Sequence, residues 1–291
     1  MFSASDVKNL REKTGAGMLD CKKALEACEG NLEKAIDWLR EKGIAKAAKK
    51  TDRIAAEGLA DIFVKGNKAV VLEVNSETDF VAKNEEFKNF VKTVGETILN
   101  SDVKTMDEAM KLSVNGETLE SLTVAITAKI GEKISIRRFE VVEKNDDEVF
   151  GSYLHMGGRI ASLVKVNGSN ADVAREVAMH AAAMRPLYVN SSLVPVDVLE
   201  KEKNIMREEL LNEGKPADKI DNILVGKVRK YYEEVCLEDQ IFVKAENKET
   251  VGKYLANNNS KLVDMVRYEV GEGMEKRNEN FADEVMSQIN G

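Results

Sequence analysis

The side chains best suited to covalent catalysis are scarce in this sequence. It has two histidines, His155 and His180, and three cysteines, Cys21, Cys28 and Cys236. No serine or cysteine comes with an obvious general base, and no Cys-x-x-Cys pair provides metal-ligand spacing. Neither the G-x-x-x-x-G-K-[ST] phosphate loop nor a G-x-G-x-x-G turn after a strand is present. We therefore expect no enzyme, no cofactor and no metal site, and an odd number of cysteines is typical of reduced thiols.

The sharpest local feature is the segment Ser76-Glu-Thr-Asp-Phe-Val-Ala-Lys83, where a predicted strand gives way to a predicted helix. Phe80 lies seven residues before Phe87, so it can extend the apolar face of that helix, with Asp79 as the helix cap. The alternative is protein recognition, in which the exposed ring is an anchor and the carboxylate competes at a cation site. Spacing alone favours the core position for Phe80.

The two histidines have different expected places. His180 falls on the same helical stripe as Val173 and Val177, which favours a buried core histidine. His155 lies at a predicted hairpin tip beside Met156-Gly-Gly158, where a contact with a partner and a plain loop position are about equally favoured.

Composition limits the classes of partner. The chain has 291 residues, 43% of them hydrophobic, and a formal net charge of -8. This acidity disfavours nonspecific nucleic-acid binding, which needs clustered positive charge. Apolar runs stay well short of the ~20 residues of a membrane span, and the N-terminus lacks a signal-peptide pattern. We expect a cytoplasmic protein that acts on no nucleic acid, membrane or small-molecule substrate.

Residues 1–53 are predicted to form a three-helix bundle and a linker. Ser5 can cap the first helix, and Gly15 can end it. The helical repeat of apolar residues stops before Gly43, and the Ala/Lys-rich stretch that follows is expected to be a solvated linker. A bundle of this size is typical of a recognition module.

Residues 54–142 and 143–270 are predicted to be two halves of an α+β core, each an antiparallel sheet with helices. In the first half, strand-like stretches flank Lys65-Gly-Asn-Lys68, which is a hairpin signal. Shifting the sequence by 92 positions lays Ile62 on Leu154, Gly66 on Gly158, Val74 on Val166, Asn75 on Asn167 and Val81 on Val173. The pattern indicates an internal duplication.

The duplication bears on the Asp79-Phe80 pair. The second copy has Ala171 and Asp172 at the matching positions, so the architecture does not require an Asp-Phe pair there. This absence favours the recognition role for the pair over the core role.

A helical hairpin and a tail complete the chain. The region from about 190 to 235 has two charged helical stretches that a Gly214-Lys-Pro216 turn separates, which predicts an antiparallel coiled coil. Residues 271–291 are predicted to be a C-terminal module, with Phe281, Val285 and Ile289 on one face of a helix.

Several motifs together resemble a known family. Leu10-Arg-Glu-Lys-Thr-Gly-Ala-Gly-Met18 and Asp20-Cys-Lys-Lys-Ala-Leu25 are similar to the opening signature of elongation factor Ts, and Thr78-Asp-Phe-Val81 resembles its second signature. The supporting matches run in order along the chain: Lys129-Ile-Gly-Glu132, Ile136-Arg-Arg138, Gly151-Ser-Tyr153, Ala178-Met-His-Ala181, Gly214-Lys-Pro216 and Val270-Gly-Glu-Gly273. The resemblance covers nearly the whole chain and is to the bacterial type.

This resemblance implies a guanine nucleotide exchange factor for the translation GTPase elongation factor Tu, in its GDP-bound and nucleotide-free forms. The N-terminal bundle would be similar to a ubiquitin-associated domain and would dock on the GTPase. The implied contacts of that bundle are Arg11, Met18, Leu19 and Lys22. Those of the core are Thr78, Asp79, Phe80 and Val81 near the Mg²⁺ site of the GTPase, Ile130 and Gly131 beside them, and His155 on a second domain.

The residues also leave a second class of function open, that of an adaptor. A non-exchanging adaptor would use the small bundle to bind some partner and the duplicated core as a scaffold. The chain also departs from the family pattern at two places. The hairpin tip at Met156-Gly-Gly158 is one residue longer than expected, and Lys244 stands where an apolar residue is expected.

Overall fold

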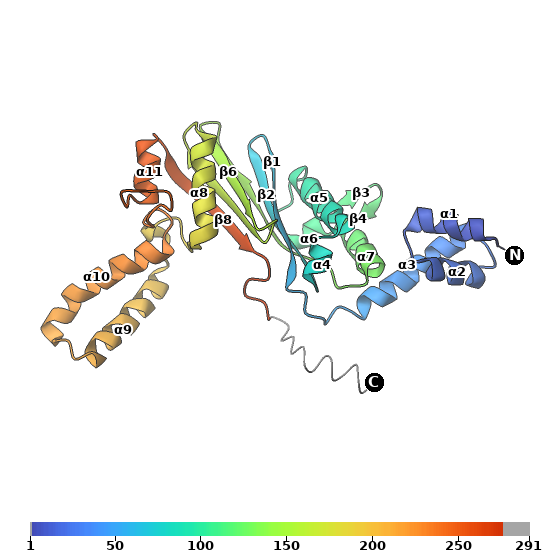
Figure 1. Ribbon diagram of the computed structural model, residues 1–291, viewed down its shortest axis with the longest axis horizontal. Helices are drawn as coiled ribbons and strands as arrows, with labels where there is room; N and C mark the ends of the chain where they lie inside the picture. The colour runs from blue at the N-terminus through green and yellow to red at the C-terminus, as the bar shows by residue number, and fades with distance from the viewer. Residues whose placement is uncertain (1, 276–291) are drawn as a thin grey trace. The chain divides into compact units, whose positions relative to one another are not determined.

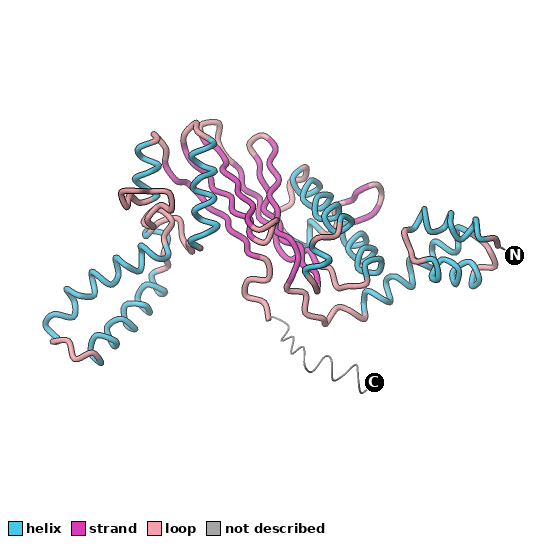
Figure 2. Tube along the Cα trace, viewed as in Figure 1, coloured by secondary structure: helices cyan, strands magenta, loops and turns pink. Residues whose placement is uncertain are grey.

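The computed structural model describes residues 2–275, and its fold is α+β, as predicted (Figure 1). Helices alternate with short strands that form small sheets, which Figure 2 shows in magenta. The predicted tail helix with Phe281, Val285 and Ile289 lies outside the described residues. Within residues 2–275, no helix is long and apolar enough to span a membrane.

The chain divides into two compact units, each of which is described by itself. Among the described residues, the first contains residues 2–63, Leu72–Glu140 and residues 269–275. The second contains Val64–Val71 and Val141–Tyr268. Strands of the first sheet therefore pass from one unit into the other.

Three helices open the first unit: α1 (Ala4–Thr14), α2 (Met18–Ala27) and α3 (Leu32–Ala48). Their shared core contains Val7, Leu10, Cys21, Ala24, Leu25 and Ala35. The cap of α1 is Ser3 and not Ser5, so that prediction is wrong. The Ser3 hydroxyl accepts a hydrogen bond from the Asp6 amide, and the Asp6 carboxylate accepts one from the Ser3 amide at 2.7 Å. Ser5 has Lys8 three residues later, and a lysine cannot return such a bond.

The third helix runs through Gly43 to Ala48, so the prediction that it ends before Gly43 is also wrong. Helix α7 (Leu119–Ile130) packs against α3, and a Cβ added at Gly43 would lie 3.3 Å from the Cβ of Ala128. Gly43 therefore permits close packing of the two helices. The Ala- and Lys-rich residues after it are good helix formers, so the helix continues.

The first sheet has the strand order β1-β2-β5, with β1 (Glu57–Lys65), β2 (Lys68–Ser76) and β5 (Ser135–Glu143). Strands β1 and β2 form the predicted hairpin. The middle strand, β2, is buried along nearly its whole length. The remaining elements of this region are α4 (Asp79–Ala82), α5 (Glu85–Leu99), α6 (Met106–Ala109), β3 (Ser113–Val114) and β4 (Glu117–Thr118).

One buried carboxylate joins β2, β5 and the chain after residue 268. Glu73 on β2 is 0% exposed, and it accepts hydrogen bonds from Arg137 Nη1 at 2.9 Å and Arg138 Nε at 2.6 Å. The Gly271 amide donates to the same carboxylate at 2.8 Å. Burial alone would raise the pKa of Glu73, but the bonds from Gly271, Arg137 and Arg138 together hold it below its ordinary value. The carboxylate is therefore charged in the folded protein at neutral pH.

The second unit is built on the sheet β6-β7-β8. Strands β6 (Glu148–His155) and β7 (Ile160–Asn167) pair antiparallel from Glu148–Asn167 to His155–Ile160, and β8 is Lys261–Glu269. Helix α8 (Ala171–Met184) packs on β6 and β7. A hairpin followed by a helix thus occurs twice in the chain. The core of this unit includes Val164, Val166, Val173, Val177, Leu237, Phe242 and Leu255.

Two helices extend from the second unit: α9 (Val196–Asn212) and α10 (Ala217–Val235). They contact each other, and Leu210, Ile220 and Leu224, close to the turn that joins them, are buried. The short elements around them are η1 (Ser191–Leu193) and α11 (Val251–Asn257). Most of the other side chains on α9 and α10 are exposed.

The close approach of α8 to β6 depends on Gly151. A Cβ at that position would lie 2.1 Å from the carbonyl carbon of Ala174, so Gly151→Ala must push the helix off the strand. We expect a loss of about 2–3 kcal/mol in the free energy of unfolding. The matched control is Gly226→Ala in α10, where nothing lies within 4 Å. It should stabilise the protein by about 0.5–1 kcal/mol. Urea unfolding measures both changes, and equal effects would contradict this packing.

The stability of the protein in acid should depend on Glu73. The folded pKa of this carboxyl lies below 4.5, so its ion pairs stabilise the fold fully above that pH and are lost as the pH falls through the folded pKa. Glu73→Gln should lower the free energy of unfolding by about 3 kcal/mol at neutral pH. This is the low end of the range for a broken buried pair, because both arginines are partly exposed. The cost should shrink below pH 4.5. Urea unfolding at neutral and acid pH would refute this if the cost stayed constant.

Candidate functional site

The segment from Ser76 to Asn84 forms a single helical turn between a strand and a helix. Strand β2 ends at Ser76, whose hydroxyl donates to the Thr78 carbonyl at 3.0 Å. Thr78 is the N-cap residue of α4, and Asn84 caps α5 by accepting from the Glu86 amide at 2.7 Å. The two caps lie six residues apart, so α4 and α5 are separate helices.

This break decides the position of Phe80. Its side chain is 79% exposed, the most exposed large apolar side chain in the described part of the chain. Val81 and Ala82 are 7% and 8% exposed, so they anchor the turn to the core. The core position that spacing alone favoured for Phe80 is therefore not found, and the ring is exposed, as the alternative of a recognition residue requires. Phe80 and Phe87 lie in different helices, so their seven-residue spacing does not place them on one helical face.

Asp79 follows the cap and is the first residue of α4, so the cap interpretation of Asp79 is also wrong. Its carboxylate pairs with Lys83 Nζ at 2.7 Å. The hydrogen bond from Lys83 lowers the pKa of Asp79. The Lys83 ammonium also lies 5.9 Å from the centre of the Phe80 ring. The turn therefore presents a carboxylate and an aromatic ring, with one lysine contacting both.

The residues after α7 lie against the base of this turn. Helix α7 ends at Ile130, and Gly131 takes the left-handed conformation that ends a helix, with φ 91°. The next residue, Glu132, accepts from the Thr78 hydroxyl at 2.7 Å and from the Thr78 amide at 3.0 Å. The structure thus brings the predicted residues Thr78 and Gly131 close together, through a residue that the sequence did not single out.

Sequence reasoning missed the two carboxylates that hold the turn. Glu132 entered only as part of a family motif, and Glu77 only as a member of the Ser76–Lys83 segment. Glu77 accepts from the Lys133 amide at 2.6 Å. These contacts join positions more than 50 residues apart, so no spacing in the sequence signals them.

The predicted contact residues of the N-terminal helices all lie at the surface. Met18 and Leu19, at the start of α2, are 48% and 73% exposed. Lys22 pairs with Glu26 on the same helix at 3.7 Å, and Arg11 on α1 is exposed. An exposed pair of apolar side chains next to basic ones suits contact with another protein.

His155 belongs to the second unit and lies at the end of β6. It is exposed, and its ring stacks on Tyr153 with 6.0 Å between the ring centres. The turn that follows has Met156, Gly157 and Gly158 with positive φ. The histidine is therefore accessible at a hairpin tip.

The prediction that His180 is a core residue is confirmed. Its side chain is 0% exposed, its Nδ1 accepts from the Val243 amide at 3.1 Å, and its Nε2 lies 3.0 Å from Gln240 Oε1. Burial lowers the pKa of His180. This neutral histidine joins α8 to the chain that follows α10.

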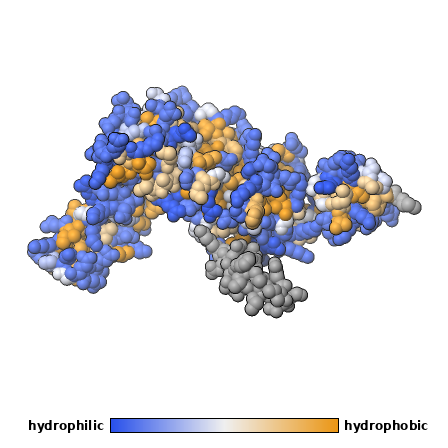
Figure 3. Space-filling model, in the orientation of Figure 1, coloured by the Kyte–Doolittle hydropathy of each residue, from blue (hydrophilic) through white to orange (hydrophobic). Residues whose placement is uncertain are grey.

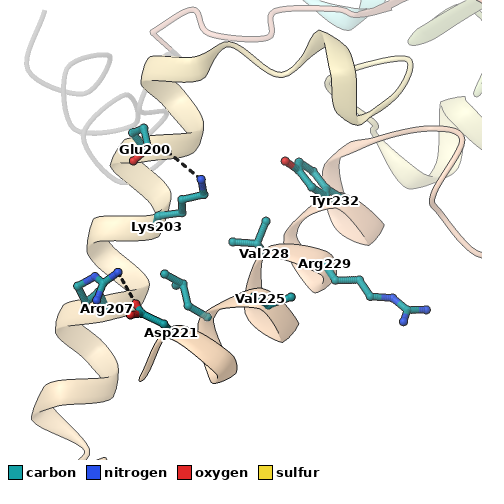
Figure 4. Close-up of a pocket in the computed structure, with 9 residues that line it drawn as sticks. Glu200, Lys203, Arg207, Asp221, Val225, Val228, Arg229 and Tyr232 are labelled. Atoms are coloured by element: carbon teal, nitrogen blue, oxygen red, sulfur yellow. Dashed lines mark hydrogen bonds and ion pairs between the residues drawn. The ribbon is translucent and has the colours of Figure 1, made fainter. Parts of the chain in front are cut away.

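Figure 3 shows apolar residues in scattered groups on a largely hydrophilic surface. A groove of about 540 Å³ lies between α9 and α10 (Figure 4). Its charged residues pair within the hairpin: Arg207 with Asp221 at 2.7 Å, and Lys203 with Glu200 at 2.8 Å. We assign no ligand to this groove. Among the described residues, no group of three or more His, Cys, Asp or Glu could hold a metal ion.

The chain matches one family model, described as Elongation factor TS, over residues 77–272. The match covers more than half of the 291 residues. It begins in the turn that carries Asp79 and Phe80 and ends at Glu272, directly after the residue whose amide binds Glu73.

Removing the Phe80 ring should leave the fold intact. The side chain is 79% exposed, so Phe80→Ala should change the free energy of unfolding by less than about 0.5 kcal/mol. The matched control is Val81→Ala, one residue further on. Val81 is 7% exposed, so its truncation should cost about 1–2 kcal/mol. Thermal or urea unfolding measures both, and a larger loss for Phe80→Ala would mean that the ring is structural.

Proposed function

Because the chain belongs to the elongation factor Ts family, whose members are translation elongation factors that promote nucleotide exchange on elongation factor Tu, we propose that it binds the GDP-bound form of that GTPase and speeds the release of GDP. It would act in the cytoplasm, on the GDP-bound and nucleotide-free forms. One observation carries the proposal: Phe80 is 79% exposed on a turn whose next two residues are buried. An exposed aromatic ring of this kind can be buried in a pocket of a partner protein and so anchor the interface.

The mechanism needs no covalent chemistry and no enzyme. Mg²⁺ and GDP stabilise each other in a GTPase, because the cation neutralises phosphate charge. A partner that binds best to the form without Mg²⁺ and nucleotide weakens nucleotide binding, and nucleotide weakens the partner by the same factor. In this proposal Phe80 wedges the site open, while Asp79 disturbs the charge balance around the cation. Thr78 and Val81 hold the two in place.

Exposed aromatic area is the source of the required free energy. A phenylalanine buries roughly 150–250 Å² when it enters a pocket. Such an anchor contributes about 2–4 kcal/mol to an interface. A loss of 1.4 kcal/mol changes an equilibrium tenfold, so one ring accounts for a substantial part of an exchange effect.

The remaining predicted contacts distribute over both units. We propose that α1 to α3 act as a ubiquitin-associated-like module that docks on the GTPase through Arg11, Met18, Leu19 and Lys22. Ile130 and Gly131 would contact the partner beside Phe80, and His155 would contact its second domain. The α9–α10 hairpin, as an antiparallel coiled coil, would not take part in the exchange step.

Stopped-flow release of a fluorescent GDP analogue from elongation factor Tu tests the proposal. The protein should accelerate release by orders of magnitude. Phe80→Ala should remove most of that effect, by a factor that corresponds to about 2–4 kcal/mol. The matched control is Val225→Ala, which truncates a 72% exposed apolar side chain on α10 and should leave the rate unchanged.

Two results would contradict this function. Tight binding to elongation factor Tu without faster GDP release would leave the protein as an adaptor that docks without exchanging. Full activity of the Phe80→Ala protein would show that exchange proceeds without the wedge.

A further inference from the structure

We propose that Glu132 is a positioning residue for exchange: its carboxylate fixes the base of the turn that presents Phe80. The inference rests on the proposed function and adds a residue outside the predicted contact set. Glu132 is half-buried and lies directly after Gly131. Its role would be to orient Phe80, with no direct contact to the partner required.

The contact between Glu132 and Thr78 is bidentate. Oε1 accepts from the Thr78 hydroxyl at 2.7 Å, and Oε2 accepts from the Thr78 amide at 3.0 Å. Thr78 is the N-cap of α4, yet its hydroxyl makes no cap bond to the helix. An N-cap threonine normally uses that oxygen to accept from a helix amide. Here the hydroxyl donates to Glu132, in the segment after α7. Helix α4 therefore begins without a hydrogen bond from its cap side chain.

The preceding residue is held in the same way. Glu77 accepts from the Lys133 amide at 2.6 Å and from Arg53 Nη1 at 3.2 Å, and its side chain is 8% exposed. Lys133 Nζ in turn donates to the carbonyls of Thr51 and Arg53 at 2.5 and 2.9 Å. Residues 77 and 78 therefore bind residues 133 and 132, and the linker after α3 closes the network.

The turn needs this external support because α4 is only four residues long. A helix of that length is not stable by itself, so its direction must come from its neighbours. Val81 and Ala82 hold one side through burial. Glu132 holds the residue two before Phe80. Without it, the turn would have to be ordered during binding, and that ordering opposes the interaction.

The test combines Glu132 and Phe80 in one double-mutant cycle, measured as the rate of GDP release from elongation factor Tu against concentration of this protein. Glu132→Ala should lower the maximum rate roughly tenfold, the factor that corresponds to one hydrogen bond to a charged group. The half-saturating concentration should stay within about twofold, because the exposed residues of α1 and α2 still dock. In the Phe80→Ala background, Glu132→Ala should have less than about twofold effect.

Two further variants separate positioning from plain stability. In Glu132→Gln, the amide can still accept from the Thr78 amide and donate to its hydroxyl, so the rate should stay within about threefold of the unsubstituted protein. Thr78→Val removes one of the two bonds while keeping the side-chain shape, and serves if Glu132→Ala does not fold. The matched control is Glu120→Ala, which removes an exposed carboxylate from α7 and should leave the rate unchanged.

The outcomes distinguish the two proposals. If Phe80→Ala leaves exchange unchanged, the wedge itself is wrong. If Phe80→Ala slows exchange but Glu132→Ala does not, or if Glu132→Ala slows both backgrounds equally, the wedge stands and the positioning role is overturned.

Discussion

The buried carboxylate of Glu73 is the interaction on which the rest of the first unit depends. A charge that is removed from water must be compensated, and here two arginines on β5 and the Gly271 amide provide the compensation. The arrangement fixes β2 beside β5. The turn with Phe80 continues directly from the end of β2, and Glu132 and Lys133 lie three and two residues before the start of β5. The hydrogen bonds between residues 77–78 and 132–133 therefore join the same two chain segments that the ion pairs of Glu73 hold together. The buried charge and the exposed turn with Phe80 depend on contacts between the same segments.

The surface of the turn shows how an exposed aromatic ring is kept available. Lys83 pairs with Asp79 and also lies over the Phe80 ring. Exposed ion pairs of this kind contribute little to stability, so separating them on binding opposes the interaction only slightly. The lysine meanwhile places a charge beside an apolar group that would otherwise favour aggregation. In the proposed function a weak local contact is suitable, because a strong one would compete with the partner.

Sequence patterns predicted those parts of the fold that follow from local chemistry. The α+β class and both hairpins follow from alternation and turn residues. The core position of His180 follows from its helical stripe. The predicted helix end at Gly43 and the core position that spacing alone favoured for Phe80 failed for a similar reason, since a distant residue or a neighbouring cap decides each position. Gly43 was predicted to follow the end of the helix, but the helix continues through it, and its missing side chain leaves room for Ala128. The spacing of Phe80 from Phe87 favoured a core position, but Asn84 caps a separate helix that begins between them.

The candidate site was only half predictable for the same reason. Asp79 and Phe80, which we propose contact the partner, could be singled out from the sequence because an aromatic residue beside an acidic one is conspicuous at the end of an element. Side chains that hold such a group in place leave none, because Glu132 and Glu77 are ordinary glutamates whose partners lie more than 50 residues away. The proposed mechanism depends on both kinds, since in it the free energy of displacing a nucleotide comes from contacts alone. In that mechanism Phe80 would set how much free energy is available, and Glu132 and Glu77 would set how much of it is lost to ordering the turn.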